Sequence, residues 1–436
     1  FGTRTRFIVM VLLLLCLSSI WSNILSFNFA IICMAPVANS SSTTDRYQFT
    51  DCTVQDQSTL LTSIVAVAAL IANIPVVFAV NKVGIRSVFT VLGLVSGLAT
   101  LLIPAAIRTG FLWVLLCRFL QGLGFATTFP VVGAFSCKWT YFKQTGLFVS
   151  VLVSYVQLSP VLTMPVSGAL CTHVGWPSVF YVHGAAALVL FVSYGLFYRN
   201  SPNKHPFVGE IETRKISIGK SAHDKRTLRR IPYLEILRTP AIWAIWLGAI
   251  GNFAAVNLMF LYNPIYISKG IDRLLDPTVF LLSFRFLVVF DRELFAGAAS
   301  DRIKFVSELT KYRLFNSVAY LGCAACFASL ASIDSERPLI NLFLLLASAG
   351  ILGAVTGGFY KAAPALSKQY SHFVTGNISI VLTVTLVGVP FLVNGLTAHN
   401  THDEWRAVFL VVAALLVLSN VIFCVFVRGE PCEWTK

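Results

Sequence analysis

The chain has 436 residues, of which 56% are hydrophobic and 12% are charged. Its mean hydropathy of +0.77 is higher than a soluble core can accommodate, so the composition excludes a water-soluble domain and predicts a membrane protein. A net charge of +14 is compatible with a nucleic-acid partner, but the basic residues gather on one side of the predicted membrane, which argues against that partner.

Apolar segments long enough to cross a bilayer recur along the whole chain. Crossing the hydrocarbon takes roughly 20 helical residues. Runs of Phe, Leu and Val with interspersed Gly and Ala favour packed helices over a β-barrel, whose strands alternate every second residue. We therefore predict an all-α membrane fold with twelve transmembrane helices in two pseudo-symmetric six-helix bundles, the spans being 7–34, 58–80, 87–107, 111–136, 144–170, 177–198, 241–266, 277–300, 312–332, 339–360, 373–396 and 406–427.

The first span is too long for a signal peptide and lacks a cleavage site, so we expect it to be retained. The chain begins at Phe1 and not at Met, and we expect a short N-terminal piece to be missing. The polar segment 35–57 that follows is predicted to be an extracytoplasmic loop. Its sequon, Asn39-Ser-Ser41, predicts glycosylation at Asn39.

Two sequence motifs occur once in each half of the chain. Trp176-Pro-Ser-Val-Phe180 is echoed by Trp405-Arg-Ala-Val-Phe409, and Asn81-Lys-Val-Gly-Ile-Arg86 is echoed loosely by Asp301-Arg-Ile-Lys304. Duplication of a six-span unit is typical of secondary transporters, whose two bundles rock about a shared central site. We therefore predict an N-terminal bundle over 1–198 and a C-terminal bundle over 241–436.

A basic, polar linker over 199–240 joins the two predicted bundles. We interpret it as a cytoplasmic, solvated hinge that is mobile or lightly helical. Most of the 33 Lys and Arg residues lie on the same side as this linker, which predicts that both termini are cytoplasmic. The predicted location is the plasma membrane or an endomembrane or vesicle, and the chain is expected to be monomeric.

Arg118 is the clearest candidate for a substrate-binding residue. It lies inside the fourth span, and Gly122 and Gly124 thin the helix one turn away. A buried arginine costs a few kcal/mol in a membrane, so we expect it to line a central cavity between the halves and to bind an anion. A purely structural role is the alternative. Asn252 and Gln157 are the other predicted cavity residues.

Three intramembrane groups are candidates for carrying a coupling proton. Glu293 and Asp291 lie in the eighth span beside Arg285 and Arg292, where each charge is either functional or neutralised by an internal salt bridge. His183 lies in the sixth span and titrates near neutral pH, but it can equally serve as a hydrogen-bonding residue between helices. We predict no metal and no cofactor other than a coupling H+ or Na+.

The cysteines lie mainly within the predicted spans. Cys323 and Cys326 have the spacing of a metal or redox motif, but we interpret them as small packing residues inside an apolar helix. Cys52 and Cys171 are both predicted to face the outside, where they can pair.

The turn Gly297-Ala-Ala-Ser-Asp301-Arg-Ile-Lys304, together with its counterpart after the second span, resembles the cytoplasmic signature loop of the major facilitator superfamily. That resemblance implies a gating role for Gly297, Asp301, Arg302 and Lys304, which would latch the inner face closed in one state. Plain helix capping is the alternative.

Further stretches resemble the anion:cation symporter family, a branch that includes sodium/phosphate cotransporters, sialin and vesicular glutamate transporters. The matching segments cover almost the whole chain: Arg118-Phe-Leu-Gln-Gly-Leu, Met164-Pro-Val-Ser-Gly168, Val174-Gly-Trp-Pro-Ser-Val-Phe-Tyr-Val-His-Gly184, Ser201-Pro-Asn-Lys-His-Pro206, Asp403-Glu-Trp-Arg-Ala-Val-Phe409, and Arg428-Gly-Glu430 with Trp434.

The resemblance implies an Arg in span one, an Arg and a Glu in span four, and an Arg in span seven for relatives that carry carboxylated substrates. Arg118 is retained, whereas the other positions align near Ile24, Phe125 and Asn252. The span-eight cluster compensates for these charges, or the substrate differs.

The leading prediction is a secondary transporter of a small organic or inorganic anion, coupled to H+ or Na+ by alternating access. The alternative is a transport-deficient protein of the same fold with a receptor-like or regulatory role. An intramembrane enzyme is disfavoured, because the sequence offers neither a nucleophile–base pair nor a metal-ligand set. The expected partners are a small anionic solute and the lipid bilayer.

Overall fold

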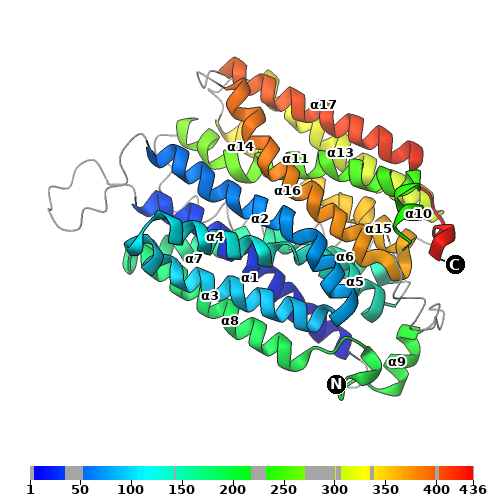
Figure 1. Ribbon diagram of the computed structural model, residues 1–436. Coiled ribbons are helices and arrows are strands. Elements are labelled where there is room, and N and C mark those ends of the chain that lie inside the picture. Colours follow the sequence, from blue (N-terminus) through cyan, green and yellow to red (C-terminus); the bar gives the residue numbers. More distant parts are fainter. Residues whose placement is uncertain are drawn as a thin grey trace, which may run out of the picture.

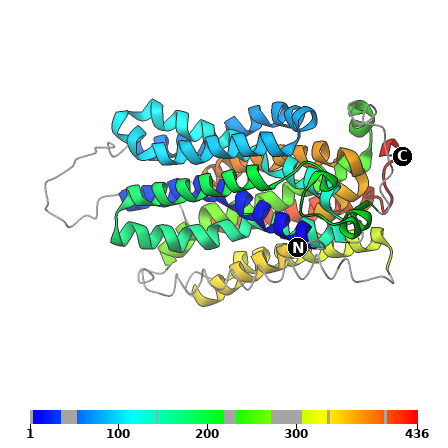
Figure 2. The same cartoon turned by 90° about the horizontal axis from the view of Figure 1, so that it is seen from below.

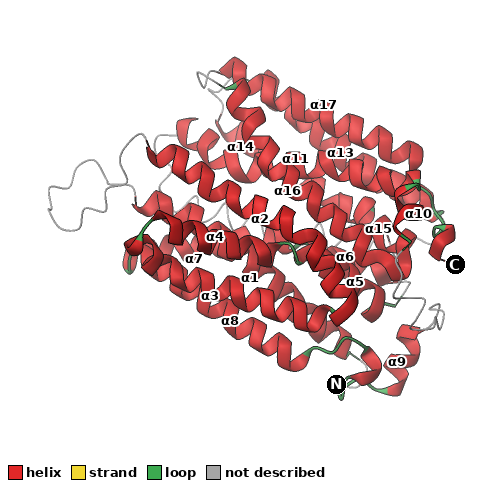
Figure 3. Ribbon diagram, viewed as in Figure 1, coloured by secondary structure: helices red, strands yellow, loops and turns green. Residues whose placement is uncertain are grey.

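The computed structural model describes residues 4–34, 53–141, 144–217, 232–270, 300, 306–333, 338–397 and 402–435. Within these ranges the regular structure is entirely helical (Figure 3). Eleven helices are long and apolar enough to cross a membrane, and they match eleven of the twelve predicted spans. The predicted eighth span, 277–300, lies outside the described residues except for Ser300, and so does Asn39.

The first half of the chain forms one helical bundle (Figure 1). Its spans are α1 (Thr5–Met34), α2 (Thr53–Val83), α3 (Ile85–Thr109), α4 (Phe111–Phe125) followed by α5 (Thr128–Trp139), α6 (Thr145–Val153) followed by α7 (Tyr155–His173), and α8 (Trp176–Phe197).

The second half forms the other bundle, shown from yellow-green to red in Figures 1 and 2. Its spans are α11 (Pro240–Gly270), α13 (Glu308–Ser332), α14 (Pro338–Leu352) followed by the 3₁₀ turn η4 (Gly353–Gly357) and α15 (Phe359–Ser367), α16 (Ser371–Leu396) and α17 (His402–Phe426). Short helices lie outside the spans: η2 (Pro202–Lys204), α9 (Glu210–Ser217), α10 (Tyr233–Leu237), η5 (Lys368–Tyr370) and η6 (Glu433–Thr435).

Both ends of the chain lie at the same end of the two bundles, which we call the terminus end (Figure 1). The α3–α4 and α7–α8 turns lie at the opposite end, which we call the loop end. Each of these turns contains a glycine with positive φ, at Gly110 and Gly175. Glycine suits these positions because a side chain is strained in this conformation.

Three spans are interrupted near their middle. The fourth breaks between α4 and α5, the fifth breaks at Ser154, and the tenth passes through η4. The fourth and tenth spans occupy equivalent places in the two halves, so their shared interruption extends the sequence repeat into the structure. Discontinuous helices near the midplane are a recurring feature of transporter binding sites.

The Trp-Phe repeat also has a structural counterpart. Trp176 begins α8 and Trp405 lies in the first turn of α17. In each helix the tryptophan contacts the phenylalanine four residues later, with ring centroids 6.2 Å apart for Trp176 and Phe180 and 6.3 Å apart for Trp405 and Phe409. The two pairs therefore occupy corresponding positions at the start of the last span of each half.

The bundles meet closely at the terminus end, where α5 and α2 pack against α16. Ser371 Oγ donates a hydrogen bond to the backbone oxygen of Gly133 at 2.6 Å. Gly376 lies against Val77 and Asn73 of α2. Glycines on both sides of this seam allow the helix backbones to approach each other, so the structure is closed at the terminus end.

The first part of the linker is docked rather than a solvated hinge. The Glu212 carboxylate, on α9, is buried and accepts hydrogen bonds from the backbone N–H groups of Thr5 and Arg6 at 3.2 and 3.1 Å. These N–H groups belong to the first turn of α1, which has no partner for them within the helix. The backbone N–H of Arg86, at the start of α3, donates to the side-chain oxygen of Asn200 in the linker at 3.0 Å. Helix-end chemistry therefore ties this segment to the first bundle.

His205 lies in the docked linker among the rings of Trp139, Phe197 and Phe207, and its Nδ1 accepts from the backbone N–H of Phe207 at 3.2 Å. Burial lowers the pKa of His205, and the positive charge of Arg199 lowers it further. The neutral form is therefore favoured when the linker is docked. Docking is stabilised above the unfolded pKa of about 6.5 and loses this contribution as the pH falls through the lowered folded value.

We expect the protection of the Phe207 amide against hydrogen exchange to fall between pH 7.5 and pH 5. Protection here means the intrinsic exchange rate at each pH divided by the observed rate at that pH. His205→Asn keeps an acceptor but does not titrate, and serves as the reference at each pH. Equal protection of the two proteins at pH 5 would contradict the prediction.

The structure decides the pairing of Cys171, which the sequence left open. Cys171, at the loop end of α7, forms a disulfide with Cys33 near the end of α1, and not with Cys52. We had placed Cys33 inside a span, whereas it lies in the exposed last turn of α1. Its exposure at the same end as Cys171 brings the two thiols together.

Candidate substrate site between the bundles

Four aromatic side chains meet between the bundles, and we call them the interface aromatic cluster: Phe129, Tyr155, Phe253 and Tyr360. The Phe129 ring lies 6.2 Å from Tyr155 and 5.7 Å from Phe253, both edge-on, and is parallel to Tyr360 at 6.1 Å. Phe253 and Tyr360 are 6.3 Å apart. Phe129 and Tyr155 belong to the first bundle, and the other two rings belong to the second.

The cluster is positioned by the helix interruptions. Phe129 lies just beyond the α4–α5 break, Tyr155 directly follows the break at Ser154, and Tyr360 lies just beyond η4. Each of these three rings therefore lies in the first turn after an interruption. A small cavity on the terminus side of the cluster is lined by Phe129 and Tyr360 together with Val132, Val153, Thr375 and Ile378.

Neutral polar groups accompany the rings. Asn252, a predicted cavity residue, is buried on α11 and donates from Nδ2 to the hydroxyl of Tyr360 at 3.2 Å. Gln157, the other one, lies two residues after Tyr155 on α7, and its side-chain oxygen has no hydrogen-bond partner. Asn252 therefore contacts the cluster directly. Gln157 lies on α7, the helix that carries Tyr155 of the cluster.

Arg118 is fully buried within the first bundle. Its Nε donates to Leu61 O of α2 at 3.1 Å, and its Nη1 donates to Ile24 O of α1 at 3.2 Å. Nη1 also donates to the side-chain oxygen of Gln121 at 2.7 Å, and the guanidinium lies 4.5 Å from the centre of the Phe27 ring. These contacts tie α1, α2 and α4 together.

This geometry differs from the expectation that Arg118 lines a cavity between the halves. Its hydrogen bonds and its ring contact all stay within the first bundle, because backbone oxygens there satisfy most of its donors. No carboxylate of the described residues pairs with it, and its Nη2 has no hydrogen-bond partner. Arg118 thus places inside the first bundle a positive charge that has no carboxylate partner among the described residues. Its role in substrate binding stays a prediction.

Gln121 was not singled out by the sequence analysis. It is fully buried, and its Nε2 donates to Asn23 O at 3.1 Å and to Thr100 Oγ1 at 2.8 Å. Its position three residues after Arg118, on the same helix face, was the signal that could have found it.

The positions that replace the expected family charges are packed or hydrogen-bonded. Ile24 is buried and offers only its backbone oxygen to Arg118. Phe125 stacks on Trp21 with centroids 5.0 Å apart. Asn252 bonds Tyr360. An aliphatic side chain, a ring and an amide therefore occupy the three positions where charges were expected.

Two of the predicted coupling groups, Glu293 and Asp291, lie outside the described residues, and so do Gly297, Asp301, Arg302 and Lys304 of the gating loop. His183 is half-buried on α8, where its Nε2 lies 3.2 Å from Ser167 Oγ of α7. That contact joins two helices of the first bundle, as the structural interpretation of His183 expected. Its part in coupling stays a prediction.

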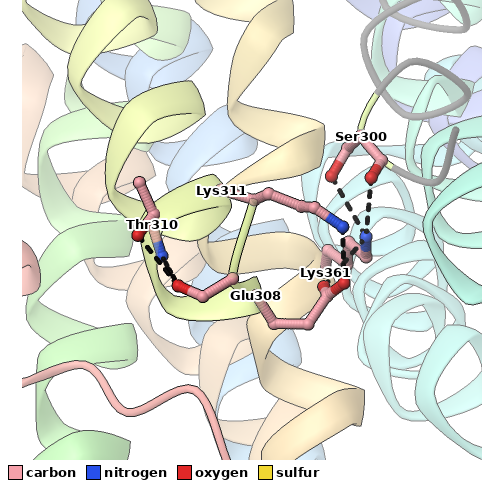
Figure 4. A network of polar contacts seen from close by, with 6 residues as sticks. Ser300, Glu308, Thr310, Lys311 and Lys361 are labelled. Carbon is pink, nitrogen blue, oxygen red and sulfur yellow. Dashed lines mark hydrogen bonds and ion pairs between the residues drawn. The ribbon is translucent and has the colours of Figure 1, made fainter. Parts of the chain in front are cut away.

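An ionic network of two buried lysines around the exposed carboxylate of Glu308 lies at the terminus end of the second bundle (Figure 4). Lys361, on α15, lies 3.3 Å from a carboxylate oxygen of Glu308 and donates to Ser300 Oγ at 3.1 Å. Lys311 donates to the other oxygen of Glu308 at 2.7 Å. Lys361 lies one residue beyond the predicted end of the tenth span at residue 360, so it was not among the predicted intramembrane charges. A lysine within Gly357–Ser367, an otherwise apolar stretch, was the available signal.

Glu308 neutralises two lysines that are both buried, so its removal should cost more than the loss of either lysine. We expect Glu308→Gln to lower the melting temperature more than Lys361→Met, because the latter leaves the Glu308–Lys311 pair intact. Melting of the purified variants checks this order, with Glu235→Gln at an exposed site of α10 as control. The reverse order would show that Lys361 is held mainly by Ser300.

Comparison with known proteins agrees with this architecture. The family model of the Major Facilitator Superfamily matches residues 11–376. Human sialin is 25% identical over 84% of this chain and 74% of its own length, and human sodium-dependent phosphate transport protein 1 is 26% identical over 78% and 73%. Vesicular glutamate transporter 3 of Danio rerio is 25% identical over 84% of this chain and 63% of its own.

Among solved structures, the proton:xylose symporter XylE bound to 6-bromo-6-deoxy-D-glucose superposes with a TM-score of 0.73. The two proteins are 13% identical, and the match covers 99% of this chain and 98% of that one. At this identity the likeness concerns the fold alone.

Proposed function

Because the chain belongs to the major facilitator superfamily, we propose that it is a secondary transporter of a small anion, driven by a gradient of H+ or Na+. The solute binds between the bundles at the interface aromatic cluster, and the seam at the terminus end opens and closes around it. Alternating access of this kind requires a central site and two bundles that move against each other.

The observation that carries the anion proposal is the charge of Arg118. It is buried, has no carboxylate partner among the described residues, and keeps Nη2 free. Phe125 follows it by seven residues, which is roughly 10 Å along a helix, and Phe129 lies one turn beyond. At an effective dielectric constant near 20, a positive charge roughly 16 Å away stabilises an anion by about 1 kcal/mol. An anion at the cluster is therefore favoured over a cation.

The names of the relatives support the same solute class, since they include transporters of phosphate and glutamate. Their transported anions differ in size and chemistry. The proposal for this chain therefore extends to small organic and inorganic anions, and it leaves the driving ion to experiment.

Uptake into proteoliposomes tests the proposal. The purified chain is reconstituted, and labelled phosphate, succinate and benzenesulfonate are each offered under an inward H+ gradient, an inward Na+ gradient, or neither. We expect one gradient to drive uptake of at least one anion above that of protein-free vesicles. Absence of uptake under every condition by a folded protein would contradict transport and favour the receptor-like alternative.

A further inference from the structure

We propose that the transported anion carries a flat apolar ring, and that the interface aromatic cluster binds this ring. The inference rests on the proposed function and names the substrate class of the same site. Its basis is the composition of the site: four rings from four helices of both bundles, each within 6.3 Å of at least one other. Aromatic rings attract another ring through edge-to-face and offset-stacked contacts at such spacings.

The placement of the rings argues for recognition in addition to packing. Three of them lie in the first turn after an interruption of their spans, at the level where the two bundles meet. Phe129 and Tyr360, from opposite bundles, also line the cavity at the seam. The cavity of about 10 Å³ is too small for a ring in this closed structure, so a ring would enter between these two residues only when the bundles separate, and it would then contact both bundles.

Unpaired donors nearby indicate an oxygen-bearing group next to the ring. Within the part of the chain that the structure describes, Trp21 Nε1 and Asn73 Nδ2 are buried without hydrogen-bond partners. The Trp21 ring stacks on Phe125, one turn before Phe129, and the Asn73 amide lies near Gly376 at the seam between α2 and α16. A buried donor without a partner costs about 1–3 kcal/mol, which a solute oxygen would recover. A carboxylate, sulfonate or ester phosphate has such oxygens.

The same residues disfavour a small, fully hydrated anion. The described side chains that form the cluster and line the cavity carry no formal charge. Inorganic phosphate would lose its hydration there without gaining an ion pair, whereas a ring-bearing anion gains apolar burial. The site therefore favours an anion whose ring supplies binding and whose single charge is held by free donors and by the field of Arg118.

Two sulfonates test this inference because they share one permanently ionised head group. Benzenesulfonate has a ring, methanesulfonate has a methyl group, and neither crosses the bilayer as a neutral acid. Binding to the purified full chain is measured by calorimetry, with inorganic phosphate as the third probe. We expect benzenesulfonate to bind about tenfold or more tighter than methanesulfonate, which matches the burial of a ring.

Variants assign that preference to the cluster. Phe129→Leu and Phe253→Leu keep apolar volume but remove a ring, and each should reduce the preference to about twofold. Tyr360→Phe keeps the ring and loses only the hydroxyl that bonds Asn252, so it should retain the preference. Phe327→Leu is the control, because that ring is fully buried and contacts Phe409 inside the second bundle.

The outcomes separate this inference from the proposed function. Methanesulfonate or phosphate binding as tightly as benzenesulfonate overturns the ring inference and leaves anion transport standing. An unchanged preference in both phenylalanine variants also overturns it. Absence of binding by all three anions to a folded chain overturns the proposed function and the inference together.

Discussion

Replacing Arg118 with leucine is expected to reduce anion uptake about fivefold while changing thermal stability little. The uptake effect follows from the loss of the positive charge that favours an anion, which is worth about 1 kcal/mol at a separation of roughly 16 Å. The effect on stability is small because the two backbone acceptors of Arg118, Ile24 O and Leu61 O, lie within helices. Each of these oxygens can still accept the hydrogen bond of its own helix after the arginine is removed. Removal of an uncompensated buried charge also offsets the hydrogen bonds that are lost.

Uptake and melting temperature, measured on the same preparations, check this prediction. Arg108→Leu, at an exposed position on α3, is the matched control and should behave like the unmodified chain. Arg118→Lys keeps the charge but lacks the planar fork that reaches several acceptors, so it should recover part of the uptake. Severe destabilisation of Arg118→Leu would instead identify the residue as a structural tie between α1, α2 and α4.

The spans and their arrangement were predictable because the bilayer imposes a length and a composition on each helix. Duplication also predicted the paired positions of Trp176 and Trp405. The burial of Arg118 followed from its apolar surroundings. Its partners did not, because Ile24 O and Leu61 O are backbone atoms that no side-chain pattern reveals.

The interface aromatic cluster was beyond the sequence analysis for a related reason. Phe129 and Tyr155 lie in stretches that are uniformly apolar, so periodicity does not show which ring faces the seam. The helix breaks that direct them were hidden as well, since both spans were predicted as continuous. The docking of Glu212 on α1 depends on a contact more than 200 residues apart in sequence, and charge alone predicted solvation for that segment.

Closure of the terminus end should depend on Gly133 having no side chain. A methyl group there would collide with Thr375 Oγ1 and lie 2.8 Å from the backbone oxygen of Ser371. The hydroxyl can rotate away, but the backbone oxygen moves only if α16 moves. We expect Gly133→Ala to destabilise the closed seam by about 1–3 kcal/mol, the usual cost of overpacking. The protein would then remain open at the terminus end.

Transport requires both closures, so net uptake should fall at least tenfold. Gly133 also lines the small cavity at the seam, so equilibrium binding of the solute is measured on the same variant to separate a loss of closure from a loss of binding. Gly388→Ala is the matched control: it makes the same substitution on α16, where no atom lies within 4 Å of the added methyl group. Thr375→Ala combined with Gly133→Ala should restore only part of the uptake, since the Ser371 oxygen still blocks approach. Full uptake by Gly133→Ala alone would mean that this contact is not the gate, and that α2 and α16 control closure through Val77 and Gly376.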